Sequence, residues 1–80
     1  MNYFKMGIPK GSELECNYNG ETCTVESERK IKFRGEEMSL TNATKVIMDI
    51  KHSIQPAPYW VFNGRNLLEI YNDTYDPIED

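Results

Sequence analysis

Alternation of apolar and polar side chains is the clearest pattern in the first part of the chain. In residues 13–27, every second side chain is apolar on both sides of the dipeptide Asn19-Gly20. The apolar positions are Leu14, Cys16, Tyr18, Cys23 and Val25. A period of two is typical of a strand with one buried face. Because Asn-Gly supplies the two positive-φ residues of a type I′ turn, we predict a β-hairpin with a two-residue turn.

The alternation continues in residues 30–34, with a basic outer side. Ile31 and Phe33 point to one face of the predicted third strand. The other face carries Lys30, Lys32 and Arg34. Gly35 is expected to end this strand, which places Glu36 and Glu37 in a turn.

Helical spacing replaces the alternation after this turn. Apolar residues recur at intervals of three and four, at Leu40, Ala43, Ile47 and Ile50. Ser39 stands directly before them, where its hydroxyl can accept a hydrogen bond from a free amide of the first turn. We therefore predict a helix that starts after Ser39, buries one apolar stripe and ends near Lys51 or His52.

A second hairpin is predicted near the end of the chain. Pro56 and Pro58 indicate an extended loop. Two strand-like runs, residues 59–62 and 65–71, then flank Asn63-Gly64. The predicted order is β-β-β-α-β-β, which makes an α+β domain with one helix packed on a small antiparallel sheet.

Length and charge divide the chain into three parts. Eighty residues suffice for one domain, which we assign to residues 10–72 after a lead-in at residues 1–9. Residues 73–80 hold four acids and no base, and we expect a mobile acidic tail there. No apolar run approaches the roughly 20 residues of a membrane span, and the start has no signal-peptide h-region. We expect a cytoplasmic protein that does not contact membranes.

The charge is distributed unevenly along the chain. The net charge is −4, yet residues 1–72 carry nine bases and nine acids. Four of the bases fall in residues 29–34. Two interpretations of this short basic run are open: a solvated strand face, or a patch that binds phosphate.

The two cysteines flank the first predicted turn. A two-residue turn would set Cys16 directly opposite Cys23, with their Cα atoms about 5.5 Å apart. A disulfide is geometrically possible, but nothing in the sequence indicates export, so we expect two buried, reduced thiols. Their spacing is not C-x-x-C, and His52 alone does not complete a zinc site. We predict no metal.

The sequence gives little indication of a catalytic site. A nucleophile needs a base within hydrogen-bond reach, and the only histidine, His52, lies at the expected helix end. No Gly-rich phosphate loop is present, because Asn-Gly turns do not form one. We predict a protein that is not an enzyme and has no cofactor.

A binding surface is better supported. Three features could share one face: the basic strand, the helix start at residues 39–42 and the aromatic pair Tyr59-Trp60. Cations and helix amides hold phosphates, and aromatic rings stack on bases. The candidate nucleic-acid-binding residues are Lys30, Lys32, Arg34, Ser39, Asn42, Lys45, Tyr59, Trp60 and Arg65. The alternative is structural: Trp60 and Phe62 belong to the core, and Ser39 only caps the helix.

Four segments, KGSEL, IKFRGEEMSLTNAT, YWVF and GRNLLEIY, resemble the RAMA domain, named for its association with restriction enzymes and adenine methylases. A related small bacterial family of unknown function shares the pattern. The matching positions are Gly11, Leu14, Gly35, Ser39, Leu40, Ala43, Trp60, Phe62, Gly64 and Leu67. The resemblance runs from about residue 10 to residue 71. Pro58-Tyr59 stands where the family has Asn-Gly before the Trp, and Asn63 replaces its second aromatic residue.

RAMA domains are proposed to recognise modified DNA, or to help restriction–modification proteins engage DNA. The resemblance therefore implies a non-catalytic domain that binds duplex DNA carrying a modified base, with a larger restriction–modification protein as partner. Two alternatives are open. One is a protein-interaction module that uses a sheet edge or the last hairpin and forms a homodimer or binds a peptide. The other is a domain whose acidic tail serves solubility alone.

Overall fold

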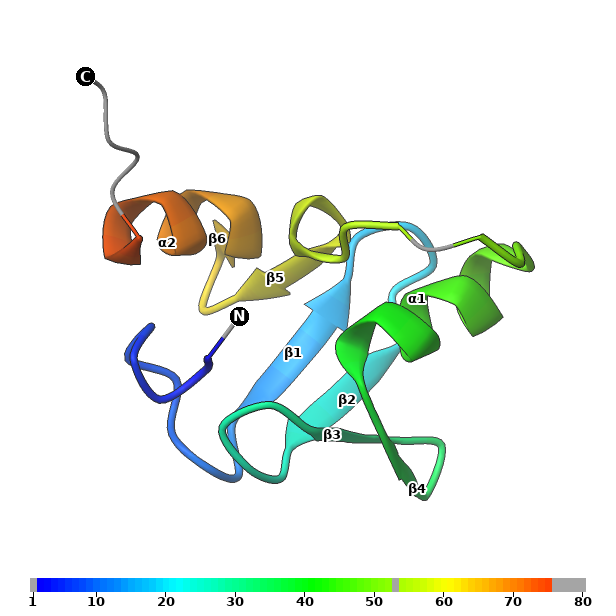
Figure 1. The fold of residues 1–80 in the computed structure, drawn as a ribbon, viewed down its shortest axis with the longest axis horizontal. Coiled ribbons are helices and arrows are strands. Elements are labelled where there is room, and N and C mark those ends of the chain that lie inside the picture. Colours follow the sequence, from blue (N-terminus) through cyan, green and yellow to red (C-terminus); the bar gives the residue numbers. More distant parts are fainter. Residues whose placement is uncertain (1, 53, 76–80) are drawn as a thin grey trace.

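The computed structural model describes residues 2–52 and 54–75 and shows a six-stranded antiparallel sheet with two α-helices (Figure 1). The strands are β1 (Glu13–Cys16), β2 (Thr22–Val25), β3 (Ile31–Phe33), β4 (Glu36–Met38), β5 (Trp60–Phe62) and β6 (Arg65–Asn66). The helices are α1 (Leu40–Met48), α2 (Leu67–Thr74) and a short 3-10 helix, η1 (Ala57–Tyr59). In space the strand order is β4-β3-β2-β1-β5-β6. The predicted α+β class is confirmed.

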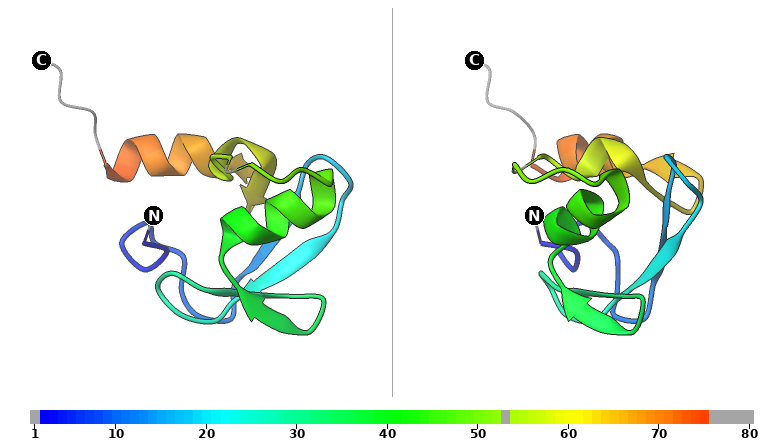
Figure 2. Two further views of the ribbon diagram at one scale, coloured as in Figure 1. Left: turned by 45° about the vertical axis from the view of Figure 1, so that its right-hand side comes forward. Right: turned by 90° about the vertical axis from the view of Figure 1, so that its right-hand side faces the viewer.

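The core lies between the sheet and α1, which covers one face (Figures 1 and 2). Its largest side chain, Trp60, is fully buried and meets the edge of Phe33 at a centroid distance of 6.5 Å. The indole Nε1–H of Trp60 donates to Thr44 Oγ1 of α1 at 2.9 Å. This bond ties the helix to the middle of the sheet, because β5 pairs directly with β1.

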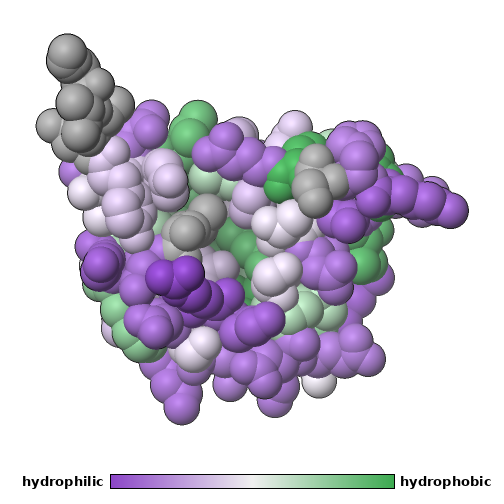
Figure 3. All heavy atoms as spheres, viewed as in Figure 1, coloured by the Kyte–Doolittle hydropathy of each residue, from purple (hydrophilic) through white to green (hydrophobic). Residues whose placement is uncertain are grey.

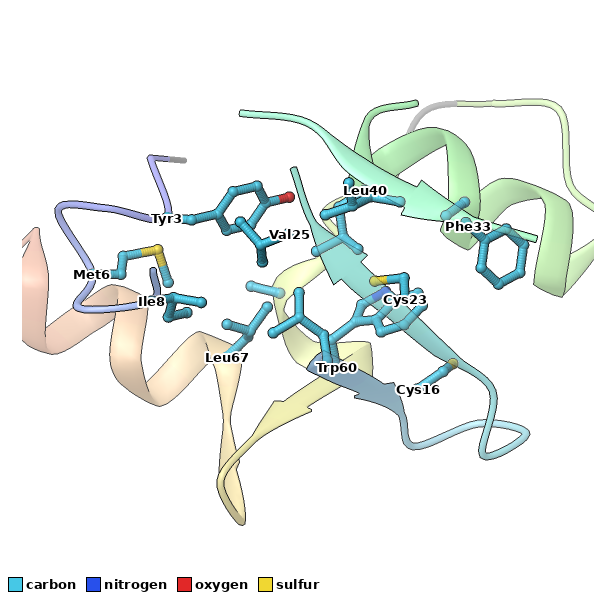
Figure 4. Packing of buried hydrophobic residues seen from close by; sticks show 14 of the residues in the cluster. Tyr3, Met6, Ile8, Cys16, Cys23, Val25, Phe33, Leu40, Trp60 and Leu67 are labelled. Carbon is cyan, nitrogen blue, oxygen red and sulfur yellow. The ribbon is translucent and has the colours of Figure 1, made fainter. Parts of the chain in front are cut away.

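The folded unit includes the predicted N-terminal lead-in. Tyr3, Met6 and Ile8 are all buried in the core, and Figure 4 shows their side chains beside Val25 and Leu67. Apolar residues spaced two and three apart in an irregular segment give no periodic signal, so the sequence did not reveal their burial.

Strand β4 is the first difference from the predicted order. Arg34 and Gly35 have φ angles of 54° and 81°, the two positive values of a two-residue hairpin turn. The chain therefore reverses, and β4 pairs with β3 so that Glu36 lies opposite Phe33. The prediction that Glu36 and Glu37 occupy a turn is wrong, because the turn lies one position earlier.

The second difference is helix α2. The predicted strand over residues 65–71 stops at Asn66, whose Oδ1 accepts from the amide of Leu68 at 2.8 Å and caps the helix. Leu67 and Ile70 bury the inner face of α2. The observed order is β-β-β-β-α-β-β-α, with two helices in place of one. Asp73 and Thr74, assigned to the acidic tail, complete α2, and residues 76–80 of that tail lie outside the described residues.

The first hairpin has a longer loop than predicted. The amide of Cys16 donates to the carbonyl oxygen of Glu21 at 2.7 Å, so residues 17–20 form a four-residue connection. Cys23 consequently lies opposite Leu14, and the predicted pairing of the two cysteines is wrong. The shift of two residues keeps every side chain on its predicted face. Both thiols are buried and free, whereas Tyr18 falls in the loop and is exposed.

Helix α1 begins as predicted and ends earlier. Ser39 Oγ accepts from the amide of Asn42 at 3.1 Å, which confirms the N-cap. The helix ends at Met48, and Asp49 takes the left-handed conformation with φ 55°. The prediction of an end near Lys51 or His52 is therefore wrong. In the part of the chain described by the structure, no helix is long and apolar enough to cross a membrane.

Candidate functional site

The outer face of the sheet carries both signs of charge. Across four strands, one row of opposed residues runs Glu13, Thr24, Lys32 and Glu37. Lys32 therefore lies directly opposite Glu37 of β4. The sequence pattern predicts a turn at Glu37 and so does not indicate this acidic neighbour. Lys30, just before β3, is exposed. The predicted basic strand face is therefore a mixed one.

Two of the predicted phosphate-binding arginines are already paired with carboxylates. Arg34 donates from Nε and Nη2 to Glu21 at 2.9 and 2.6 Å. This bidentate bond lowers the pKa of Glu21 and raises that of Arg34. Arg65 donates to Asp73 Oδ2 at 2.7 Å and lies 3.6 Å from Glu69, and the bond to Asp73 raises the pKa of Arg65. A phosphate would have to displace these partners.

The predicted aromatic stackers lie in the folded core or against it. Trp60 is fully buried, so its assignment as a stacking residue is wrong. Tyr59 is half-buried in η1. Its carbonyl oxygen accepts from the amide of Asn17 at 2.9 Å, which fixes this loop to the β1–β2 connection. The three candidates on α1 diverge: Ser39 caps the helix, Asn42 is exposed and Lys45 is half-buried.

Two adjoining hollows lie at the start of α1. The smaller has a volume of about 200 Å³ and is lined by Tyr3, Arg29, Ser39, Leu40, Thr41 and Pro56. The larger has a volume of about 390 Å³ and is lined by Thr41, Gln55, Pro56 and Tyr71. Because both share Thr41 and Pro56, they form one depression, called the α1 groove below. Figure 3 shows an apolar floor between hydrophilic walls in the middle of this face.

The hydroxyl of Tyr3 is the most informative group in the groove. Tyr3 is only 2% exposed, and its hydroxyl points toward Leu40, which lines the same hollow (Figure 4). Within residues 2–52 and 54–75, no group hydrogen-bonds to this oxygen. Tyr3 is one of the residues that line the smaller hollow. Burial raises the pKa of Tyr3, so its hydroxyl stays protonated and can donate.

Other donors surround the same hollow. Arg29 contributes an exposed guanidinium at its rim. The amides of Leu40 and Thr41 belong to the first turn of α1, where no intrahelical acceptor is available. The next two amides are satisfied by Ser39, through its hydroxyl at 3.1 Å and its carbonyl at 3.1 Å. A hydroxyl, a guanidinium and helix amides together suit an anion such as a phosphate.

The larger hollow has different chemistry. Tyr71 is half-buried there, with its ring centroid 4.7 Å from that of Tyr75. Gln55 is exposed and offers both an amide donor and an acceptor. Pro56 and Thr41 complete the lining. An aromatic ring beside an amide suits a planar, polar-edged group.

Two further hollows are less suited to an anion. One, of about 540 Å³, lies beside the β5–β6 turn and has Glu13 and Glu15 in its lining. The other, of about 410 Å³, is lined by Phe4, Gly7, Pro9 and Lys10. In the ranges that the structure describes, no group of three or more His, Cys, Asp or Glu side chains could hold a metal ion.

The sequence predicted little of this groove. Of the nine predicted site residues, only Ser39 lines it. Leu40 and Thr41 follow it in the chain, and the remaining lining residues come from segments far apart, near positions 3, 29, 55 and 71. Arg29 had a usable signal as the first base of the basic run, whereas Tyr3 and Tyr71 had none. Comparisons with known protein families, characterised proteins and solved structures found no significant match.

Proposed function

We propose that this protein is a non-catalytic nucleic-acid-binding domain that holds a phosphate of its ligand in the α1 groove. The observation that carries the proposal is the smaller hollow, which brings the buried Tyr3 together with the guanidinium of Arg29 and the start of α1. A guanidinium beside the free amides of a helix start favours an anion such as a phosphate.

The resemblance to the RAMA domain supports nucleic acid as the ligand, and with it a cytoplasmic location and a link to restriction–modification. The Ser39-Leu40 start lies in the groove, so the segment that carries the resemblance also contributes to the proposed site. Duplex DNA with a modified base is the ligand that the resemblance favours. A larger restriction–modification protein is the corresponding partner.

The test is an NMR titration of labelled protein with short DNA at low and moderate salt. Shifts are expected at residues 3, 29, 39–41, 55–56 and 71. Arg29→Gln should weaken binding about tenfold or more, because a hydrogen bond to a charged group is worth about 1.5–3 kcal/mol. Tyr3→Phe keeps the ring in the core and should weaken binding through the hydroxyl alone.

Lys32→Gln is the matched control. It removes one exposed positive charge, as Arg29→Gln does, but from the outer face of the sheet. Equal affinity for this variant and the wild type is the expected result. If Lys32→Gln weakens binding and Arg29→Gln does not, the outer strand face is the site and the groove assignment is wrong.

The rival function is a protein-interaction module, favoured by one observation. Phe4 is 48% exposed beside a hollow lined by Gly7, Pro9 and Lys10. Such a surface would bind a peptide or a second copy of the chain, with little salt dependence. No shifts with DNA, together with a dimer that Phe4→Ala dissociates in ultracentrifugation, would favour this rival.

A further inference from the structure

We infer that the α1 groove takes a single unpaired nucleotide, with its phosphate in the smaller hollow and its base in the larger one. The inference rests on the proposed function, which it deepens by naming the unit of nucleic acid that is recognised. It differs from recognition of an intact duplex, in which bases stay stacked and paired.

The two hollows separate two kinds of chemistry. The smaller gathers a guanidinium from Arg29, the first amides of α1 and the hydroxyl-bearing residues Tyr3, Ser39 and Thr41. The larger combines the Tyr71 ring with the Gln55 amide. An amide side chain can both donate to and accept from the edge of a base. A guanidinium with helix amides and hydroxyls suits a phosphate, and a ring beside an amide suits a base.

The two hollows are also adjacent in the way that a nucleotide requires. Thr41 and Pro56 line both of them, so a ligand that extends past these two residues reaches both hollows. The hollow assigned to the base with its sugar is the larger one, of about 390 Å³. The hollow assigned to the phosphate is the smaller one, of about 200 Å³.

The chemistry of the larger hollow requires an unpaired base. In a duplex, each base face is covered by its neighbours and the pairing edge is occupied. Only a single-stranded or flipped-out nucleotide exposes a face to a tyrosine ring and an edge to an amide. A free mononucleotide has the same exposed groups, so the experiment must separate these two sources.

The test measures affinity with four probes. They are a ten-nucleotide single-stranded DNA, the same strand annealed to its complement, the same strand with abasic sites throughout, and adenosine monophosphate. Binding is followed by fluorescence anisotropy of the labelled strands and by competition with the mononucleotide. The full chain is used throughout.

Two groove variants probe the larger hollow. Tyr71→Leu and Gln55→Ala should each weaken single-strand binding about fivefold or more, as expected for the loss of base stacking or an edge contact, and leave abasic-strand binding unchanged. Tyr18→Leu, in the exposed β1–β2 loop, is the control for loss of a tyrosine ring. Because Tyr71 also packs on Tyr75, circular dichroism must show that this variant is folded. Gln55 is exposed, so Gln55→Ala is the variant to use if Tyr71→Leu does not fold.

The expected result is a single strand that binds at least about tenfold more tightly than its duplex, as the loss of one stacked base implies. If adenosine monophosphate competes at concentrations near the dissociation constant of the strand, the free nucleotide is a ligand in its own right. If it does not compete at such concentrations, the ligand is a nucleotide within a strand. Both results support the inference.

Two results would overturn the inference. Equal affinity for single strand and duplex would do so, as would single-strand binding that Gln55→Ala and a folded Tyr71→Leu leave unchanged. The proposed function fails differently. In that case neither form of DNA binds, or Arg29→Gln has no effect on either.

Discussion

The buried hydroxyl of Thr44 makes two hydrogen bonds inside the core. Its Oγ1 donates to the carbonyl oxygen of Leu40 at 2.8 Å and accepts from Trp60 Nε1 at 2.9 Å. Thr44→Val keeps the shape of the side chain but leaves the indole N–H buried without an acceptor. We expect a loss of about 1–3 kcal/mol in the free energy of unfolding. Urea denaturation followed by the fluorescence of Trp60, the only tryptophan, measures it.

A matched control for this substitution exists in the same helix. Thr41 lies one turn earlier and is half-buried at the groove, so Thr41→Val should change stability by less than about 0.5 kcal/mol. In a Trp60→Phe background, Thr44→Val should cost clearly less, because no indole N–H remains to be satisfied. Unfolding is followed by circular dichroism in that background, since it contains no tryptophan. Equal costs in the two backgrounds would show that the Trp60–Thr44 bond is not the cause.

Single residues were predictable where their role depends on near neighbours. Ser39 was identified as a cap from the apolar spacing that follows it, and the structure confirms it. The sequence does not decide whether Trp60 is buried in the core or exposed on the surface. Its burial depends on the pairing of β5 with β1, some 44 positions away in the chain. Tyr3 and Arg29 join one hollow only through tertiary packing. No local pattern contains that information.

At the scale of elements, one ion pair links two turns of the sheet. Glu21, just before β2, accepts from Arg34 in the β3–β4 turn. The pKa of Glu21 is lowered first by this hydrogen bond. A lowered folded-state pKa means that the stabilisation is present above the ordinary glutamate value of about 4.3 and is lost as the pH falls through the lower folded value. The wild type should therefore exceed Glu21→Gln in stability at pH 7, and this difference should shrink below about pH 4.

The measurement is the urea midpoint of both proteins from pH 7 down to pH 3. Glu15→Gln is the control, because Glu15 is exposed on β1 opposite Thr22. Its difference from the wild type should vary little over this range. A difference for Glu21→Gln that stays constant with pH would mean that the ion pair does not stabilise the turns.

The end of α1 offers a substitution that should stabilise the protein. Asp49 has φ 55°, a left-handed conformation that glycine adopts without strain, and its charge lies at the negative end of the helix. Asp49→Gly is expected to raise the free energy of unfolding by up to about 1 kcal/mol. Asp49→Ala is the control, because it removes the charge and keeps the Cβ. If both variants gain equally in thermal denaturation, charge and not backbone strain is responsible.

Elements were predictable where pattern and turn chemistry agree. The hairpins and α1 follow from alternation, Asn-Gly and Ser39. Strand β4 was missed because its two glutamates are unusual in strands, although Arg34-Gly35 permits the turn before it. The hairpin signal at Asn63-Gly64 predicts a strand over residues 65–71, where the structure has helix α2. Its apolar residues, Leu67, Ile70 and Tyr71, have helical spacing, and Asn66 is a usable cap.

At the scale of the whole molecule, the N-terminal segment is part of the fold. Ile8 is fully buried in the core, whereas Phe4 is 48% exposed. Ile8→Ala should lower the free energy of unfolding by about 2–5 kcal/mol, a large share of the stability of an 80-residue chain. Phe4→Ala should have little effect. Urea denaturation of the two variants tests whether residues 10–72 alone make up the folded unit. A small effect of Ile8→Ala would favour that smaller unit.

The net charge of the molecule limits how it can bind nucleic acid. At −4, the chain as a whole repels phosphates, and two of its arginines are paired with carboxylates. Binding through the α1 groove would then involve one or two phosphates. For a single strand, the slope of log affinity against log salt should be about −0.7 to −1.4. Screening of the overall repulsion would make it still shallower.

Anisotropy titrations of the ten-nucleotide strand between about 50 and 200 mM salt measure this slope. Arg29→Gln should bring it close to zero, because it removes the cation at the phosphate hollow. Lys32→Gln should leave it unchanged, because Lys32 lies on the opposite face of the sheet, across from Glu37. A slope of about −3 or steeper would require several phosphate contacts. That many cations are found only outside the groove, so such a slope would move the site to the outer strands and the exposed lysines.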